Sequence, residues 1–210
     1  MTQDNGGLNE GASVRVLDEF EAITTALRNA GFTHVPPMWR ADVCIEKRLG
    51  DWTAEQIATG MAPEPYEVYR NAMNLLMYGG ASCLWECLIG NGTGTGGQTL
   101  TYFNNGNAYI GVGDSSASEV ATHTDLQASS NKVRVAMDAT YPTHTDGTTS
   151  GAASTVWRST FGSSSANFVW NEWGIFNGSS GGRMLNRKVS SLGTKVSGAT
   201  WQLTITLTLS

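Results

Sequence analysis

The chain has 210 residues, 40% of them hydrophobic and 15% charged, which is enough to bury a core in one large or two small domains. Its formal net charge is −5: the first 79 residues hold eleven Asp and Glu against six Lys and Arg, and the remainder holds seven of each. Neither part has the basic patch that binding to a phosphate backbone requires, so we expect no nucleic-acid partner. We also expect no secretion signal and no membrane partner, because the sequence lacks a basic flank with an apolar run and any apolar run of membrane-spanning length.

The N-terminal region is predicted to be helical. A polar, Gly-rich arm over residues 1–12 precedes apolar residues at three- and four-residue steps, which predict a helix over residues 14–30 that ends at Gly31. Pro37 is well placed to open a second helix, which we predict over residues 38–49.

A short helix and a proline-rich segment follow. Thr53 and Gln56 form the two ends of a capping box, and the helix that they begin is predicted to stop at Gly60. The segment Pro63–Pro65 forces an extended path, so we place the boundary of the helical region there. A further helix is predicted over residues 81–89, before a Gly- and Thr-rich loop.

The C-terminal region is predicted to consist of strands. Trp201–Leu209 alternates apolar and polar residues without a break, and a period of two predicts a strand with one buried face. We expect this strand to neighbour the aromatic segment Phe168–Phe176 and the segment Arg183–Val189, the three running antiparallel. Seven strands are predicted between turn clusters: Thr99–Phe103, Ala108–Val112, Lys132–Asp138, Thr155–Phe161, Phe168–Phe176, Arg183–Val189 and Thr200–Leu209.

Together these elements predict an α+β protein in which a helical N-terminal region is followed by an antiparallel β-sandwich of the jelly-roll-like or immunoglobulin-like kind. We divide the chain into an N-terminal arm with helices (residues 1–64), a connecting segment that carries the helix over 81–89 (residues 65–97) and a β-sandwich domain (residues 98–210).

The three cysteines, Cys44, Cys83 and Cys87, form an odd set, which argues against a disulfide framework and favours reduced, buried thiols. Cys83 and Cys87 are one helical turn apart and would be able to face the same ion. A metal site needs two more ligands, and no His lies near them in the sequence. We therefore expect core thiols, no metal site and no cofactor.

One polar loop holds residues of the types found in a nucleophile, a base and an orienting acid: Ser115, His123 and Asp125. The strand–turn–helix context of a nucleophile elbow is missing, so we interpret them as loop residues. His144 lies in another turn-rich segment and is interpreted in the same way. We predict no catalytic residues.

Glu172 is the most informative carboxylate, because it lies inside the aromatic segment between Trp170 and Trp173. A charge in such a place must be paired or lie at an edge, and Arg187 or Arg158 would be able to pair with it across a sheet. An enzyme that hydrolyses glycosides would need a second carboxylate, which the sequence does not place. We predict a structural ion pair.

The aromatic content, with seven Trp and six each of Tyr and Phe, would suit a sugar-binding groove. Most of these residues occupy alternating strand positions, however, so packing in the core explains them. A carbohydrate-binding module would require Trp157, Trp170 or Trp173 to line an open face.

Several short segments follow one another in a specific order over roughly residues 65–210: Asn107–Ser115, Thr124–Gln127, Met137–Pro142, Trp157–Gly162, Ala166–Phe176, Met184–Lys188 and Leu192–Lys195. This order resembles that of a family of tailed-phage virion proteins, most of which have no assigned role. The segment Asn171–Phe176 is also similar to the Glu-Ile-Gly-Leu-Phe turn of collar-type tail-fibre domains.

The resemblance implies a non-enzymatic structural protein located in a phage virion and made in the host cytoplasm. Its first implication is a capsid decoration or cement protein that binds the outer capsid lattice, with the major capsid protein as partner. Self-association, as a trimer, is expected by analogy with decoration proteins. The alternatives are a tail-fibre or baseplate attachment protein, whose partners are tail proteins, and, from other classes, a carbohydrate-binding module or an enzyme.

Overall fold

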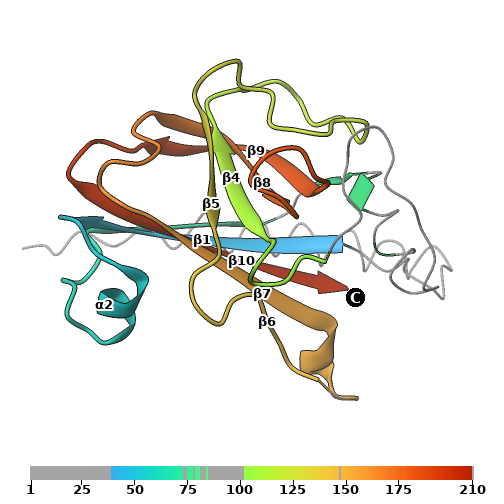
Figure 1. Ribbon diagram of the computed structural model, residues 1–210, viewed down its shortest axis with the longest axis horizontal. Coiled ribbons are helices and arrows are strands. Elements are labelled where there is room, and N and C mark those ends of the chain that lie inside the picture. Colours follow the sequence, from blue (N-terminus) through green and yellow to red (C-terminus); the bar gives the residue numbers. More distant parts are fainter. Residues whose placement is uncertain are drawn as a thin grey trace, which may run out of the picture.

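The computed structural model describes residues 39–72, 75–77, 79–80, 84, 102–146 and 148–209. These residues form two antiparallel sheets that enclose a common core, as in a β-sandwich (Figure 1). The predicted sandwich is therefore confirmed, and it begins far earlier in the chain than expected.

Each sheet has five strands among the residues that the structure describes. The first, which we call sheet A, has the order β2-β1-β10-β7-β6 and consists of β1 (Trp39–Leu49), β2 (Glu67–Ala72), β6 (Thr143–His144), β7 (Ser154–Phe161) and β10 (Ala199–Leu209). The second, sheet B, has the order β3-β9-β8-β4-β5 and consists of β3 (Leu75–Leu76), β4 (Tyr109–Gly113), β5 (Lys132–Ala136), β8 (Val169–Phe176) and β9 (Met184–Thr194). The short helix α2 (Ala54–Ala58) and the 3-10 turn η1 (Ser150–Ala153) lie in connections.

The core lies between the sheets and is built from alternate positions along the strands. On β10, the buried side chains of Trp201, Leu203, Ile205 and Leu207 face inward, as their period of two predicted. The ring of Trp201 packs edge-on against that of Trp170 from sheet B, with centroids 4.7 Å apart. The strongest sequence signal in the chain thus marks the central strand of sheet A.

The predicted helix over residues 38–49 is wrong, because this segment forms β1. Ala41, Val43 and Ile45 are buried at alternate positions, and the strand pairs with β10 from Trp39↔Leu209 to Leu49↔Ala199. Pairing with a long central strand outweighs the helix-starting tendency of a preceding proline. The helix predicted over residues 14–30 lies outside the described residues, so the helical N-terminal region is not supported.

Other predicted elements are confirmed or corrected by the strand pairing. The capping box of Thr53 and Gln56 is present at the start of α2, and the strands predicted within residues 108–209 are confirmed as β4, β5, β7, β8, β9 and β10. β8 pairs with β9, but β10 lies in the other sheet between β1 and β7, so the three are not neighbours as predicted. Of the predicted strand at 99–103, the described residues Tyr102 and Phe103 are not in a strand.

The Pro63–Pro65 segment does not follow a helical region as predicted, because the strand β1 and the short helix α2 precede it. It belongs to the connection between β1 and β2, which pair directly with each other in sheet A. Of the helix predicted over residues 81–89, only Leu84 is described, and it is helical. None of the helices formed by the described residues is long and apolar enough to cross a membrane.

Candidate functional site

On the outer face of sheet B, an ion pair and several hydrogen bonds connect the strands to a loop. A long connection between β4 and β5, residues 114–131, lies over this face; we call it the covering loop (at the top of Figure 1). Beneath it a second small apolar cluster is buried, formed by Met77, Leu126, Phe176 and Met184. Leu126 is the loop's own contribution to that cluster, so the loop is part of the folded core.

Glu172 of β8 lies under the covering loop and is fully buried. Arg187 of β9 donates to its Oε2 at 2.7 Å, and the backbone amides of Gln127 and Ala128 donate to its two carboxylate oxygens at 3.0 and 2.7 Å. The predicted structural ion pair is confirmed with Arg187; Arg158 pairs with Asp138 instead, at 2.8 Å. The carboxylate therefore joins two strands of the sheet to the loop above them.

Arg187 holds the other half of the covering loop. Its Nη2 donates to the carbonyl oxygen of Ala117 at 2.9 Å, and its Nη1 donates to that of Ser118 at 3.3 Å. Glu119 adds a further link, because its Oε1 accepts the backbone amide of Val189 at 2.6 Å. The two buried charges thus neutralise each other. At the same time they supply hydrogen-bond partners to backbone groups of the covering loop, which pairs with no strand through these groups.

Glycines on β4 make room for this arrangement. A Cβ atom at Gly113 would lie 2.5 Å from Oε1 of Glu172 and 3.1 Å from the Cβ of Ala128. At Gly111 it would lie 2.7 Å from the ring of Phe176 and 3.2 Å from Leu126. Both positions are strand glycines that allow a loop to approach the sheet closely.

The candidate nucleophile, base and acid are not joined in the structure. Ser115 Oγ accepts the amide of Ala117 at 3.2 Å, and Nδ1 of His123 lies 3.4 Å from Nη1 of Arg187. Asp125 pairs with two cations of β5, and among the described residues we find no hydrogen bond that connects it to His123 or Ser115. All three lie in the covering loop, where their contacts fix the loop's shape.

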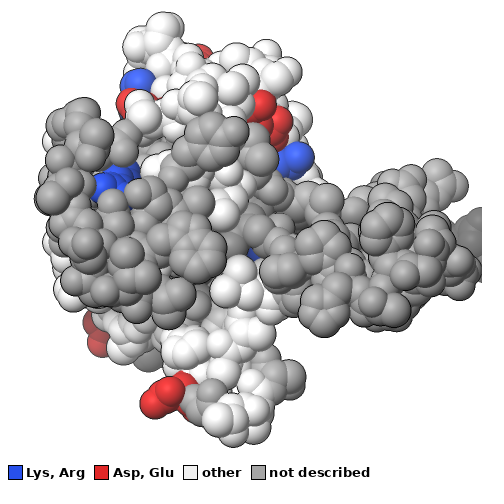
Figure 2. Space-filling model, turned by 90° about the vertical axis from the view of Figure 1, so that its right-hand side faces the viewer, with Lys and Arg blue, Asp and Glu red and all other residues white. Residues whose placement is uncertain are grey.

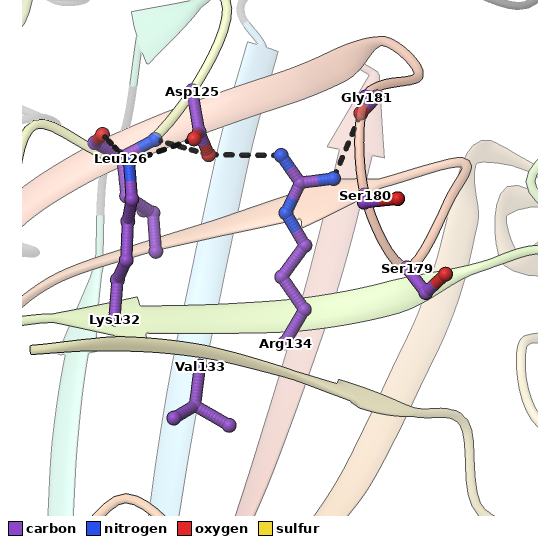
Figure 3. Close-up of a pocket in the computed structure, with 8 residues that line it drawn as sticks. All are labelled: Asp125, Leu126, Lys132, Val133, Arg134, Ser179, Ser180 and Gly181. Atoms are coloured by element: carbon purple, nitrogen blue, oxygen red, sulfur yellow. Dashed lines mark hydrogen bonds and ion pairs between the residues drawn. The ribbon is translucent and has the colours of Figure 1, made fainter. Parts of the chain in front are cut away.

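Asp125 forms one side of an open pocket of about 220 Å³ at the end of sheet B (Figure 3). Its oxygens accept from Lys132 and Arg134, each at 2.8 Å. Burial raises the pKa of Asp125, but the hydrogen bonds from these two cations outweigh it, so the net pKa lies below its usual value. The pocket is lined by Asp125, Leu126, Lys132, Val133, Arg134, Ser179, Ser180 and Gly181.

The guanidinium of Arg134 is committed to the protein framework. Its Nη1 donates to the carbonyl oxygens of Gly178 and Gly181 at 2.9 and 2.8 Å, and its carbon lies 3.6 Å from the ring centroid of Phe176. Nη1 and Nη2 of Arg134 are therefore already engaged within the protein. Sequence reasoning missed the pocket, because its parts come from segments far apart in the chain and only the fold brings them together.

Lys195 and Cys44 also have shifted pKa values. Lys195 is buried and donates from Nζ to the carbonyl oxygen of Gly162 and to Oδ1 of Asn167, both at 2.8 Å. Burial lowers the pKa of Lys195 to about 8, although the nearby Asp51 carboxylate opposes the shift. Burial likewise raises the pKa of the half-buried Cys44 thiol, against the influence of a nearby arginine, which disfavours the reactive thiolate form.

Metal binding and sugar binding would each require side chains in a particular arrangement. No group of three or more His, Cys, Asp or Glu side chains within the described ranges is placed to hold a metal ion, and Cys83 and Cys87 lie outside those ranges. The three tryptophans that a sugar platform would need are buried, with exposed fractions of 7% for Trp157, 0% for Trp170 and 1% for Trp173.

His144, interpreted from the sequence as a loop residue, lies on the short edge strand β6. Its Nδ1 is 3.0 Å from the carbonyl oxygen of Ser154 on the neighbouring strand β7, and the side chain is exposed.

Comparison with known proteins found no relative: no family model, no curated protein and no solved structure matches the chain.

Proposed function

We propose that the chain is a non-enzymatic structural protein of a tailed-phage virion, and in the first place a capsid decoration protein that binds the outer capsid lattice. The observation that carries the proposal is that the buried ion pair of Glu172 and Arg187 has a structural role. This buried pair is fully engaged in hydrogen bonds that hold the covering loop to sheet B. The segments Ala166–Phe176 and Met184–Lys188, on which much of the resemblance to virion proteins depends, contain these two residues.

The distribution of charge supports a role in protein–protein contact. On the face shown in Figure 2, the acidic and basic side chains are scattered, and neither sign forms a continuous patch among the residues that the structure describes. A low charge density with a rigid β-sandwich suits repeated contacts between proteins better than attraction to a phosphate backbone.

The alternatives receive less support. The carbohydrate-binding module needs an exposed aromatic platform, and Trp157, Trp170 and Trp173 are buried. The enzyme needs a cleft that joins Glu172 to a second carboxylate, and Glu172 has no exposed surface. A tail-fibre or baseplate attachment protein is the second candidate, because the strand that holds Glu172 contains the segment similar to collar-type tail-fibre domains.

Gold labelling of intact virions with an antibody to this chain, viewed by electron microscopy, tests the proposal. Label spread over the head is the expected result. Label confined to the tail tip or collar would move the protein to the attachment apparatus, and particles that carry no label, with an epitope shown to be accessible, would overturn the virion assignment. Sedimentation equilibrium of the purified chain tests the trimer that we propose by analogy.

A further inference from the structure

The connection between β1 and β2 is a long segment that buries none of its side chains. From Leu49 to Val68 no residue is buried, and helix α2 within it has no buried residue either. A helix of five residues gains little stability from its own hydrogen bonds, so it normally buries an apolar face. We call residues 50–66 the α2 connection; it projects from one end of the sandwich, at the lower left of Figure 1.

The apolar side chains of this end are exposed to solvent. Half of the exposed large hydrophobic residues in the described part of the chain belong to this end. They come from the α2 connection, the adjoining strand ends and the turn between β9 and β10: Leu49, Met61, Tyr66, Val68 and Val196. The turn is tied to the connection through the amide of Gly50, which donates to the carbonyl oxygen of Gly198 at 2.6 Å. These side chains belong to segments that meet at one end of the sandwich, and exposed apolar groups of this kind are typical of a protein–protein interface.

Polar bonds hold the α2 connection in place without burying its apolar groups. The amide of Trp52 donates to Thr200 Oγ1 at 3.1 Å, and the indole Nε1 of Trp52 donates to the carbonyl oxygen of Leu49 at 2.7 Å. Arg48 donates to the carbonyl oxygen of Pro63 at 3.0 Å, and Asp51 accepts the amide of Ser163 at 3.0 Å. The surface is thus preorganised, which lowers the entropic cost of binding a partner.

The charged residues near these apolar groups are mostly acidic. Between residues 46 and 67 the chain has five carboxylates, Glu46, Asp51, Glu55, Glu64 and Glu67. The two cations of the same stretch, Lys47 and Arg48, are buried and paired with Glu67 and Glu46 at 2.7 and 2.8 Å. The rim is therefore acidic, and a second copy of the chain docked on the same surface would bring two acidic rims together.

We propose that the surface formed by the α2 connection, Leu49, Val68 and Val196 is the docking site for a protein whose complementary surface has an apolar centre and a rim of Lys and Arg side chains. This inference rests on the proposed function, within which the partner is the virion protein that carries the chain. Leu49, Met61 and Tyr66 supply the apolar contacts, and the carboxylates select the basic partner and speed the encounter.

Binding to phage particles assembled without this chain tests the inference. Purified full-length protein is titrated onto such particles, and cosedimentation gives the dissociation constant. We expect the triple variant L49S/M61S/Y66S to bind at least about 100-fold more weakly than the natural chain, since each contact side chain contributes about tenfold when it is central to an interface.

A matched control uses three equally exposed apolar residues elsewhere. The natural Leu49, Met61 and Tyr66 are 67%, 62% and 53% exposed, and the control variant Y102S/V120S/L209S changes residues that are 70%, 48% and 53% exposed. The control is expected to bind like the natural chain. Unimpaired binding of L49S/M61S/Y66S would overturn the docking site and leave the virion role standing, whereas a natural chain that binds no particle would overturn both.

Charge reversal tests which partner occupies the surface. The variant E55K/E64K is expected to associate about tenfold more slowly at low salt, with a smaller salt dependence, whereas D146K, which reverses an exposed carboxylate elsewhere, is expected to leave the rate unchanged. Faster association of E55K/E64K would overturn the basic partner. Sedimentation equilibrium distinguishes the other occupant: an oligomer that L49S/M61S/Y66S converts to a monomer would assign the surface to a second copy.

Discussion

The covering loop (residues 114–131) and the α2 connection (residues 50–66) are both long links between adjacent strands, yet they relate to the sandwich in opposite ways. The covering loop buries Leu126 and Ala128 and is held by a fully buried ion pair. The α2 connection buries nothing and is held by hydrogen bonds at its base. The difference indicates which connection stabilises the fold and which remains available to a partner.

The difference follows from where each connection lies relative to its sheet. The covering loop faces strands with glycines at 111 and 113, so it approaches closely enough for backbone amides to reach Glu172. The α2 connection continues from the end of sheet A, where β1 and β10 have already filled their own hydrogen-bonding positions. A loop that lies over a sheet replaces its contacts with water by contacts with the protein. A loop beyond the end of a sheet stays hydrated until a binding partner displaces the water.

The largest effect is expected when the buried pair is broken. Arg187→Met leaves the buried Glu172 carboxylate without its cation, so the free energy of unfolding should fall by about 3–5 kcal/mol in urea denaturation. Arg40→Met, which removes a partly exposed pair with Asp42, should cost less than about 1 kcal/mol. Equal losses in the two variants would mean that the buried pair contributes no more to stability than the partly exposed Arg40–Asp42 pair.

A smaller loss is expected when the loop is pushed away from the sheet. In Gly113→Ala the new methyl group meets Glu172 and Ala128 at 2.5 and 3.1 Å, and the free energy of unfolding should fall by about 1–3 kcal/mol. Gly106→Ala serves as control, because its nearest neighbour would lie 4.0 Å away. Slow hydrogen exchange at the amides of Gln127 and Ala128 should be lost in Gly113→Ala; retained protection would contradict the proposed close approach.

Acid should weaken the covering loop through Asp125. The folded pKa of this carboxyl is lowered by Lys132 and Arg134, so the unfolded chain, with a pKa of about 3.9, takes up the proton first. The resulting stability is present above the unfolded pKa and is lost as pH falls through the folded pKa. Asp125→Asn should therefore be less stable than the natural chain at pH 7 by less than about 1 kcal/mol, with a gap that closes on acidification. If the stability difference between Asp125→Asn and the natural chain in thermal unfolding did not change with pH, the lowered pKa of Asp125 would be excluded as its cause.

The smallest effect on stability is expected at the α2 connection. The variant L49S/M61S/Y66S changes exposed side chains only, so its free energy of unfolding should stay within about 0.5 kcal/mol of the natural value. Leu126→Ala in the covering loop, by contrast, should lose about 2–5 kcal/mol. A loss of several kcal/mol in the triple variant, measured in the same urea titration, would show that the α2 connection stabilises the fold after all.

Local patterns in the sequence were enough to find many elements. The alternation in Trp201–Leu209 marks a strand with one buried face, and the capping box of Thr53 and Gln56 marks the start of a helix. The isolated charge of Glu172 among tryptophans required a cation, and Arg187 lies on the strand that pairs with its own. These features depend on a few neighbouring residues, so the sequence alone determined them.

Which segments meet was decided only by the tertiary structure. Residues 39–49 follow a helix-starting proline but become a strand, because β10 offers them a complete antiparallel partner. β10 itself joins β1 and β7 instead of β9, and the pocket at Asp125 draws on two loops from different parts of the chain. Strand partners and loop positions depend on contacts between distant residues, whose free energy no local window of sequence contains.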